Sequence, residues 1–71
     1  MYVYADKYNQ LKKLCNKYGY RYRILNCCDF IGNMHVDILD GNKFVACGCK
    51  KTLPEAIEQA IQETYKQINK E

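Results

Sequence analysis

The strongest constraint on the fold is the segment of residues 52–64, which combines a helix start signal with a regular apolar stripe. Thr52 can cap the first turn, and Glu55 stands three residues on, where it can reach back to the N–H of the cap. Pro54 falls in the first turn, where its missing N–H is not needed. Apolar residues recur at steps of three and four: Leu53, Ala56, Ile57, Ala60, Ile61, Tyr65 and Ile68. This spacing predicts an amphipathic helix with one buried side.

A second amphipathic helix is predicted near the N-terminus, over about residues 6–18. Asp6 can cap its start, and Gly19 can end it. Its apolar positions are Tyr4, Tyr8, Leu11, Leu14, Cys15 and Tyr18. Its opposite side carries Lys12, Lys13, Asn16 and Lys17. We therefore expect a basic, solvent-exposed surface on this helix.

Between the helices the hydrophobic period changes to two, which predicts strands. Alternating runs begin at Tyr20, at Met34 and at Lys43. A turn is expected over residues 29–33, and Asp40-Gly41-Asn42 is a strong hairpin signal. The sequence thus predicts a single domain over residues 1–71 of the α+β class. Its expected order is α-β-β-β-α, a three-stranded antiparallel meander with two helices packed on one face.

A tight hairpin turn also predicts which residues face the helices. Val45, Cys47 and Cys49 are expected to share the covered face with Met34, Val36 and Ile38. The other face would then carry Arg21, Arg23, Leu25, His35, Asp37, Leu39, Phe44, Ala46 and Gly48. Exposed Leu39 and Phe44 near each other would mark a partner-binding site on that face.

Length and composition favour a binding protein over an enzyme. A chain of 71 residues buries only about 60% of its unfolded surface, which leaves little room for a deep substrate cleft. No apolar run approaches the roughly 18 residues that span a bilayer, and the N-terminus lacks the pattern of a signal peptide. An odd number of cysteines, five, favours reduced thiols over a disulfide framework. We expect a soluble protein of the cytoplasm.

Charge is unevenly distributed along the chain. Up to Leu25 there are six basic residues against Asp6, a local charge of +5, whereas the remainder has five basic and seven acidic residues, a local charge of −2. An acidic partner is therefore expected at the basic end.

Candidate chemistry is sparse. Four thiols, those of Cys27, Cys28, Cys47 and Cys49, could gather around zinc. The Cys-x-Cys spacing is not a zinc knuckle, however, and favours core packing, so neither a metal nor another cofactor is expected. There is no serine, and His35 is the only histidine, so a Cys–His pair is the sole nucleophilic option and no catalytic residues are predicted.

The run Tyr18-Gly19-Tyr20-Arg21-Tyr22-Arg23 interleaves rings and cations, as a platform for single-stranded nucleic acid does. Strand alternation sends Tyr20 and Tyr22 to one face and the arginines to the other. We therefore interpret the run as an ordinary amphipathic strand.

Two families resemble this chain. The element order and the loop Gly32-Asn33-Met34-His35 resemble the double-stranded-RNA-binding domain, which implies RNA as a partner. The lysine cluster with which that family contacts phosphates is replaced by Leu53, Pro54 and Ile57, although Lys50 and Lys51 lie just upstream.

The whole chain is also similar to the phage ABA sandwich family, through its element order and the segment of residues 52–61. That resemblance implies a phage or mobile-element source and no catalytic residues. We expect a non-enzymatic protein that binds a host protein or protein–nucleic acid complex, for example an anti-CRISPR inhibitor of bacterial defence. A dsRBD-like nucleic-acid-binding module is the alternative, and a homodimer is a further possibility. The expected partner-binding residues are Lys12, Lys13, Lys17, Arg21, Arg23, Leu39 and Phe44.

Overall fold

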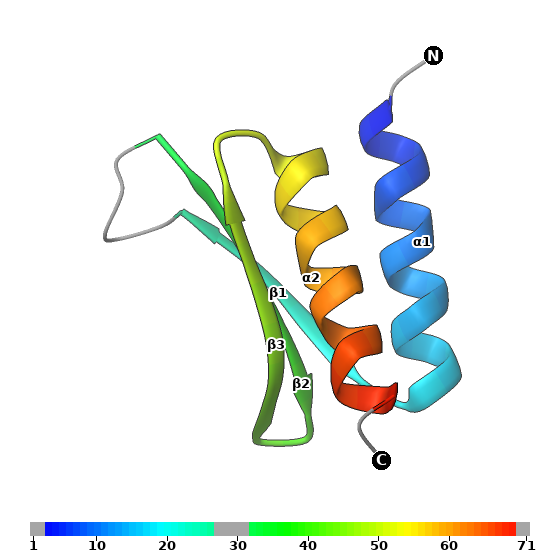
Figure 1. Cartoon of the computed structure of the whole chain (residues 1–71). Coiled ribbons are helices and arrows are strands. Elements are labelled where there is room, and N and C mark those ends of the chain that lie inside the picture. The colour runs from blue at the N-terminus through cyan, green and yellow to red at the C-terminus, as the bar shows by residue number, and fades with distance from the viewer. Residues whose placement is uncertain (1–2, 27–31, 70–71) are drawn as a thin grey trace.

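The computed structural model describes the backbone of residues 3–26 and 32–69, with side chains from Asp6 onward. Within these ranges the elements are α1 (Val3–Tyr18), β1 (Arg21–Asn26), β2 (Met34–Asp40), β3 (Lys43–Lys50) and α2 (Leu53–Asn69) (Figure 1). The described strands form one antiparallel sheet in the order β1-β2-β3. The predicted α-β-β-β-α order and α+β class are confirmed. Cys27, Cys28 and most of the predicted turn at residues 29–33 lie outside the described residues.

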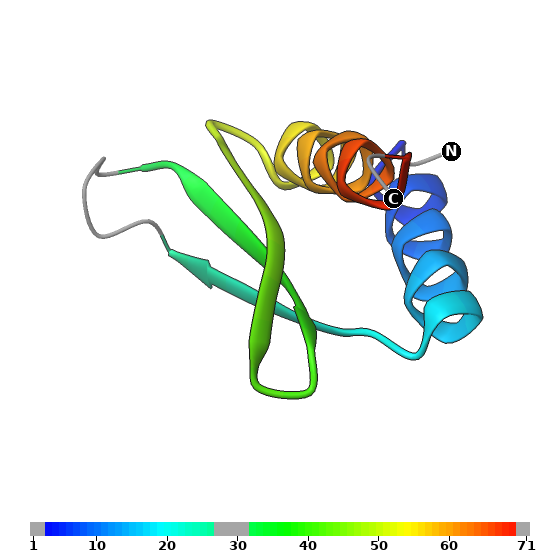
Figure 2. The ribbon, with the colours of Figure 1, turned by 60° about the horizontal axis from the view of Figure 1, so that its bottom comes forward.

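The helices α1 and α2 lie side by side on the same face of the sheet (Figures 1 and 2). α2 packs across β3 and β2, while α1 packs against α2. Tyr8 of α1 reaches β1, where its ring meets Tyr22 edge-on at a centroid distance of 5.9 Å. The buried core between these layers consists of Leu11, Leu14, Cys15, Val36, Ile38, Ala56, Ile57 and Ala60.

A β-bulge in β3 changes the expected register of the hairpin. Leu39 pairs with Phe44 beside the turn, but the next residue of β2, Ile38, pairs with Ala46 and not with Val45. Val45 is thus the extra residue of the bulge, and it stays partly buried against the core.

The bulge reverses the facing of every residue that follows it in β3. Ala46 and Gly48 are cross-strand partners of the buried residues of β2 and face the helices. Cys47 and Cys49 face the opposite side. The prediction that these two cysteines lie under the helices is therefore wrong, as is the placement of Ala46 and Gly48 on the uncovered face.

Close contact between α2 and β3 explains why the covered face of β3 carries small residues, Ala46 and Gly48. A Cβ atom added at Gly48 would lie 2.1 Å from the carbonyl oxygen of Ala56 and 2.8 Å from the amide nitrogen of Ala60. No larger side chain fits at that position without moving the helix. A bulge-free strand would point Cys47 and Cys49 at this helix.

The helix ends follow the predicted signals with small differences. α1 begins at Val3, so Asp6 lies in its first turn and is not its cap; its charge there still suits the helix dipole. Gly19 has φ of 71°, and the amide of Tyr20 donates to the carbonyl of Cys15, which closes a Schellman motif.

α2 begins where its start signal predicts. The amide of Ala56 donates to the Thr52 carbonyl, and the Thr52 hydroxyl donates to the Glu55 carboxylate at 2.7 Å. Tyr65, expected on the buried stripe, is exposed, and Thr64 is fully buried in its stead. The Thr64 hydroxyl donates to the carbonyl of Ala60, which satisfies its polar atom inside the core.

Candidate functional site

The sheet face opposite the helices is the candidate functional site. No element within residues 3–26 and 32–69 covers it (Figures 1 and 2). The register of the strands arranges its residues in three cross-strand rows. The rows are Arg21–Leu39–Phe44, Arg23–Asp37–Cys47 and Leu25–His35–Cys49. We call this set of residues the open face.

The first row joins an aromatic ring, an aliphatic side chain and a cation. The Phe44 side chain is 58% exposed although it stands in a strand, and Leu39 beside it is half-buried. Arg21 is exposed and makes no ion pair with any described residue. An adjoining groove of about 380 Å³ is lined by Arg21, Tyr22, Arg23, Leu39, Gly41 and Asn42. The structure thus brings together four of the predicted partner-binding residues, Arg21, Arg23, Leu39 and Phe44.

The middle of the open face is a charged network around Asp37, which is only 7% exposed. Arg23 donates to its Oδ2 atom at 2.8 Å, and His35 Nε2 donates to its Oδ1 atom at 2.5 Å. Burial works to raise the pKa of Asp37, but the hydrogen bonds and charges of Arg23 and His35 outweigh it and hold the pKa below its usual range. The carboxylate is therefore ionised and fixed in orientation.

Two thiols complete this part of the open face. Cys47 lies across from Asp37, and Cys49 lies across from His35. Burial, followed by the charges of Asp37 and Glu63, raises the pKa of the Cys47 thiol. Donor atoms of His35, Asp37 and Cys47 all lie within 4.8 Å of one another.

Sequence reasoning missed this cluster because it assumed a regular hairpin. One signal could have revealed it. Ala46 and Gly48 in the strand are small, as are Ala56 and Ala60 in the helix, and small residues on two elements allow them to pack closely. This shared feature indicates that Ala46 and Gly48 face the helix.

The other predicted residues lie elsewhere. Lys12, Lys13 and Lys17 are exposed on α1, on the helix-covered side of the sheet, so they do not join the open face. The Lys12 ammonium lies 5.3 Å from the centroid of Tyr8, and Lys17 lies 5.4 Å from that of Tyr18. These lysines form a separate basic surface.

The start of α2, where a double-stranded-RNA-binding domain would present lysines, is acidic. Glu58 pairs with Lys7 of α1 at 2.7 Å, and Glu55 accepts from Thr52. Both glutamates are exposed. Phosphates would meet carboxylates at this position.

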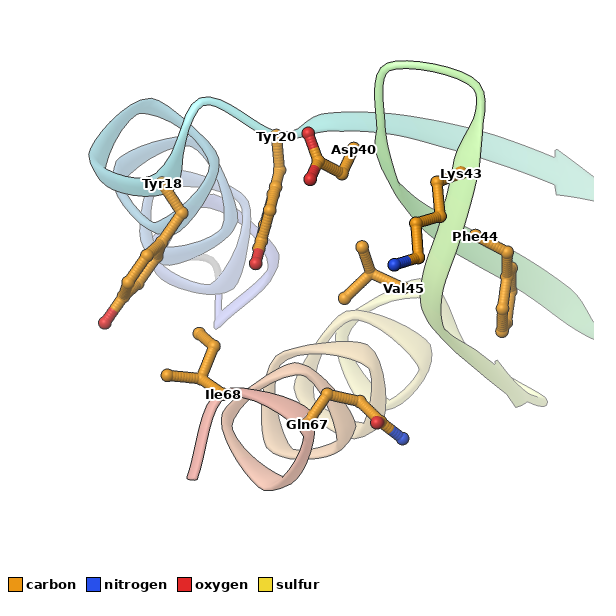
Figure 3. A pocket seen from close by; sticks show the side chains of 8 residues that line it. All are labelled: Tyr18, Tyr20, Asp40, Lys43, Phe44, Val45, Gln67 and Ile68. Carbon is orange, nitrogen blue, oxygen red and sulfur yellow. The ribbon is translucent and has the colours of Figure 1, made fainter. Parts of the chain in front are cut away.

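A further cavity of about 370 Å³ opens where the ends of α1 and α2 meet the β2–β3 hairpin. Its lining residues are Tyr18, Tyr20, Asp40, Lys43, Phe44, Val45, Gln67 and Ile68. Tyr18 and Tyr20 are stacked beside it, and Lys43 and Val45 point toward it, while Phe44 lies on the far side of β3 (Figure 3).

The outer edge of β3 is partly closed. The amide of Cys49 points away from β2 and donates to the side-chain oxygen of Gln59 on α2 at 2.9 Å. A side-chain cap of this kind removes one of the edge donors with which another strand could pair.

Comparison with protein-family models, curated proteins and solved structures finds no match to this chain. Among the described residues, no helix is both long and apolar enough to cross a membrane.

Proposed function

We propose that this chain is a non-enzymatic binding protein that docks an acidic surface of a host protein on its open face, in a stoichiometric complex. One observation carries the proposal: Phe44 is 58% exposed beside Leu39 and Arg21, on a sheet face that no described element covers. A row of this composition is what protein interfaces place at their centre, where aromatic residues and arginine contribute most of the binding energy.

The size of the molecule suits this role. A standard interface takes about 800 Å² from each partner. The chain has 5176 Å² of accessible surface, so one face can supply that area. Arg21 lacks a carboxylate partner among the described residues and can pair with one across an interface.

The open face is less suited to single-stranded nucleic acid. Such proteins stack successive bases on rings that stand next to cations. Here Tyr20 and Tyr22 are half-buried on the helix side, and Arg21 and Arg23 point the other way. Among the described residues, Phe44 is the aromatic side chain of the open face.

Inhibition of a bacterial defence system is the biological role that we propose for such a complex. The proposal rests on the resemblance that we infer from the element order and residues 52–61 to phage ABA sandwich proteins, and on the basic charge of the first 25 residues. A small basic ligand can occupy the acidic or nucleic-acid-binding surface of a defence enzyme without performing chemistry.

Affinity capture from a bacterial lysate with matched baits tests the proposal. The baits are the wild-type protein, the open-face variants Phe44→Asp and Arg21→Glu, and the α1 variant Lys12→Glu/Lys13→Glu/Lys17→Glu. We expect a protein that the wild type and the α1 variant retain at equal levels and that each open-face variant loses. Circular dichroism of all baits verifies folding.

Nucleic acid bound to the basic surface of α1 is the second candidate, favoured by the exposure of Lys12, Lys13 and Lys17. It predicts the reverse result: capture is lost in the α1 variant and after nuclease treatment, and it weakens steeply with salt. Capture that all variants retain contradicts both candidates. Light scattering that shows a dimer in the wild type and a monomer in Phe44→Asp would identify a second copy as the occupant of the open face.

A further inference from the structure

Three metal-binding side chains of different chemistry meet on the open face. They are the imidazole of His35, the carboxylate of Asp37 and the thiol of Cys47, and their donor atoms lie within 4.8 Å of one another. The bulge at Val45 creates this group, because it turns Cys47 away from α2 and onto the open face, beside its cross-strand partner Asp37.

The backbone holds these residues in place. Asp37 and Cys47 are direct cross-strand partners in β2 and β3, and His35 stands two residues before Asp37, on the same face. Side chains at such positions have fixed Cβ spacing. A tetrahedral ion with bonds of about 2.0–2.3 Å needs its donors roughly 3.5 Å apart, which side-chain rotation can reach from the present arrangement.

The charges of the group suit a dication. A thiolate and a carboxylate together supply two negative charges, and imidazole adds a neutral donor. Arg23 holds the Oδ2 atom of Asp37, so the Oδ1 atom remains on the side of His35 and Cys47. Hydrogen bonds to the second oxygen of a ligating carboxylate are usual in metal sites and fix its orientation.

The donor set selects the class of metal. A sulfur, a nitrogen and a single oxygen donor favour zinc and similar transition metals, whereas magnesium and calcium take oxygen ligands. We propose that His35, Asp37 and Cys47 form a binding site for a zinc-type divalent transition metal, open to solvent at its remaining position. The half-buried positions of His35 and Cys47 leave a path for the ion.

Cobalt(II) titration of the reduced, chelator-treated protein tests this site. We expect one cobalt ion per chain, with the visible absorption of tetrahedral cobalt and a thiolate-to-cobalt charge-transfer band in the near ultraviolet, both removed by added zinc. Cys47→Ser should abolish the charge-transfer band. Cys47→Ser and His35→Ala should each weaken binding by at least about tenfold. Cys15→Ala is the matched thiol control, because Cys15 is buried in the core on α1, and it should bind as the wild type does.

The wild-type spectrum decides the proposal even if a variant fails to fold, which circular dichroism would reveal. A titration without the thiolate band overturns it. So does equal affinity in folded Cys47→Ser, or a loss of binding in folded Cys15→Ala. No partner protein takes part, so this result is independent of the proposed docking on the open face.

Discussion

The helix-covered face and the open face of the sheet are built from alternate residues of the same strands, yet they differ in burial and in charge. In β2 and β3 the covered face consists of small and aliphatic side chains such as Val36, Ile38, Ala46 and Gly48, all buried. The open face carries an exposed aromatic ring and a network of charged and titratable groups.

This difference shows that only one face of a small sheet can be used for binding, because packing determines the residues of the other. The covered face is determined by packing, since α2 approaches β3 so closely that only glycine fits at position 48. No described element packs on the open face, so packing does not limit the size or the charge of its side chains. Substitutions on the two faces should therefore differ in their cost to stability.

The largest contrast is expected between two neighbours in β2. Ile38 is fully buried, and Ile38→Ala should lower the free energy of unfolding by about 2–5 kcal/mol through lost contacts and a residual cavity. Leu39→Ala, on the open face, should lower it by about 1 kcal/mol, because that side chain is only half-buried. Urea denaturation measures both values, and equal losses would contradict the difference between the faces.

The next contrast lies in β3 and tests the bulge. Gly48→Ala should lower the free energy of unfolding by about 1–3 kcal/mol, because the added methyl group overlaps the backbone of α2. Cys47→Ala, one residue away on the opposite face, should cost about 0.5 kcal/mol or less. The same denaturation experiment applies. A Gly48→Ala protein as stable as the wild type would show that α2 does not approach β3 as described.

A smaller effect is expected within the open face itself. Asp37→Asn removes the charge that orders Arg23 and His35, and it should lower the free energy of unfolding by about 1 kcal/mol at neutral pH. Arg23→Gln provides the comparison and should cost less, since the Arg23 side chain is 59% exposed. Both variants are measured with chelator present. An Asp37→Asn protein that is more stable than the wild type would contradict this prediction, because it would show that the Asp37 carboxylate destabilises the fold.

Most of the fold could be predicted from sequence because its signals are local. The start of α2 at Leu53 follows from Thr52 and Glu55, and the end of α1 follows from Gly19. The exposure of Arg21 and Phe44 follows from alternation near the turn. Each of these depends on residues close together in the chain.

The missed features depend on tertiary contacts. The bulge at Val45 places the smallest residues of β3 under a helix that begins several residues later. The strand indicates this only through Ala46 and Gly48, whose small size has meaning once they are matched with Ala56 and Ala60 of that helix. Thr64 is buried because its hydroxyl can return to the helix backbone, whereas Tyr65 lies at the margin of the stripe. The placement of Cys47 beside His35 and Asp37 follows from the bulge and could not be predicted without it.

The most direct test of the altered facing of β3 is the rate of thiol alkylation in the native protein. Peptide mapping after brief exposure to iodoacetamide gives the alkylation rate of each cysteine. The protection of a cysteine is its rate in concentrated urea divided by its rate in the native protein. The account predicts strong protection for Cys15, which is buried in the core, and weak protection for Cys47, which lies on the open face. Protection of Cys47 as strong as that of Cys15 would place it beneath α2 and contradict the account.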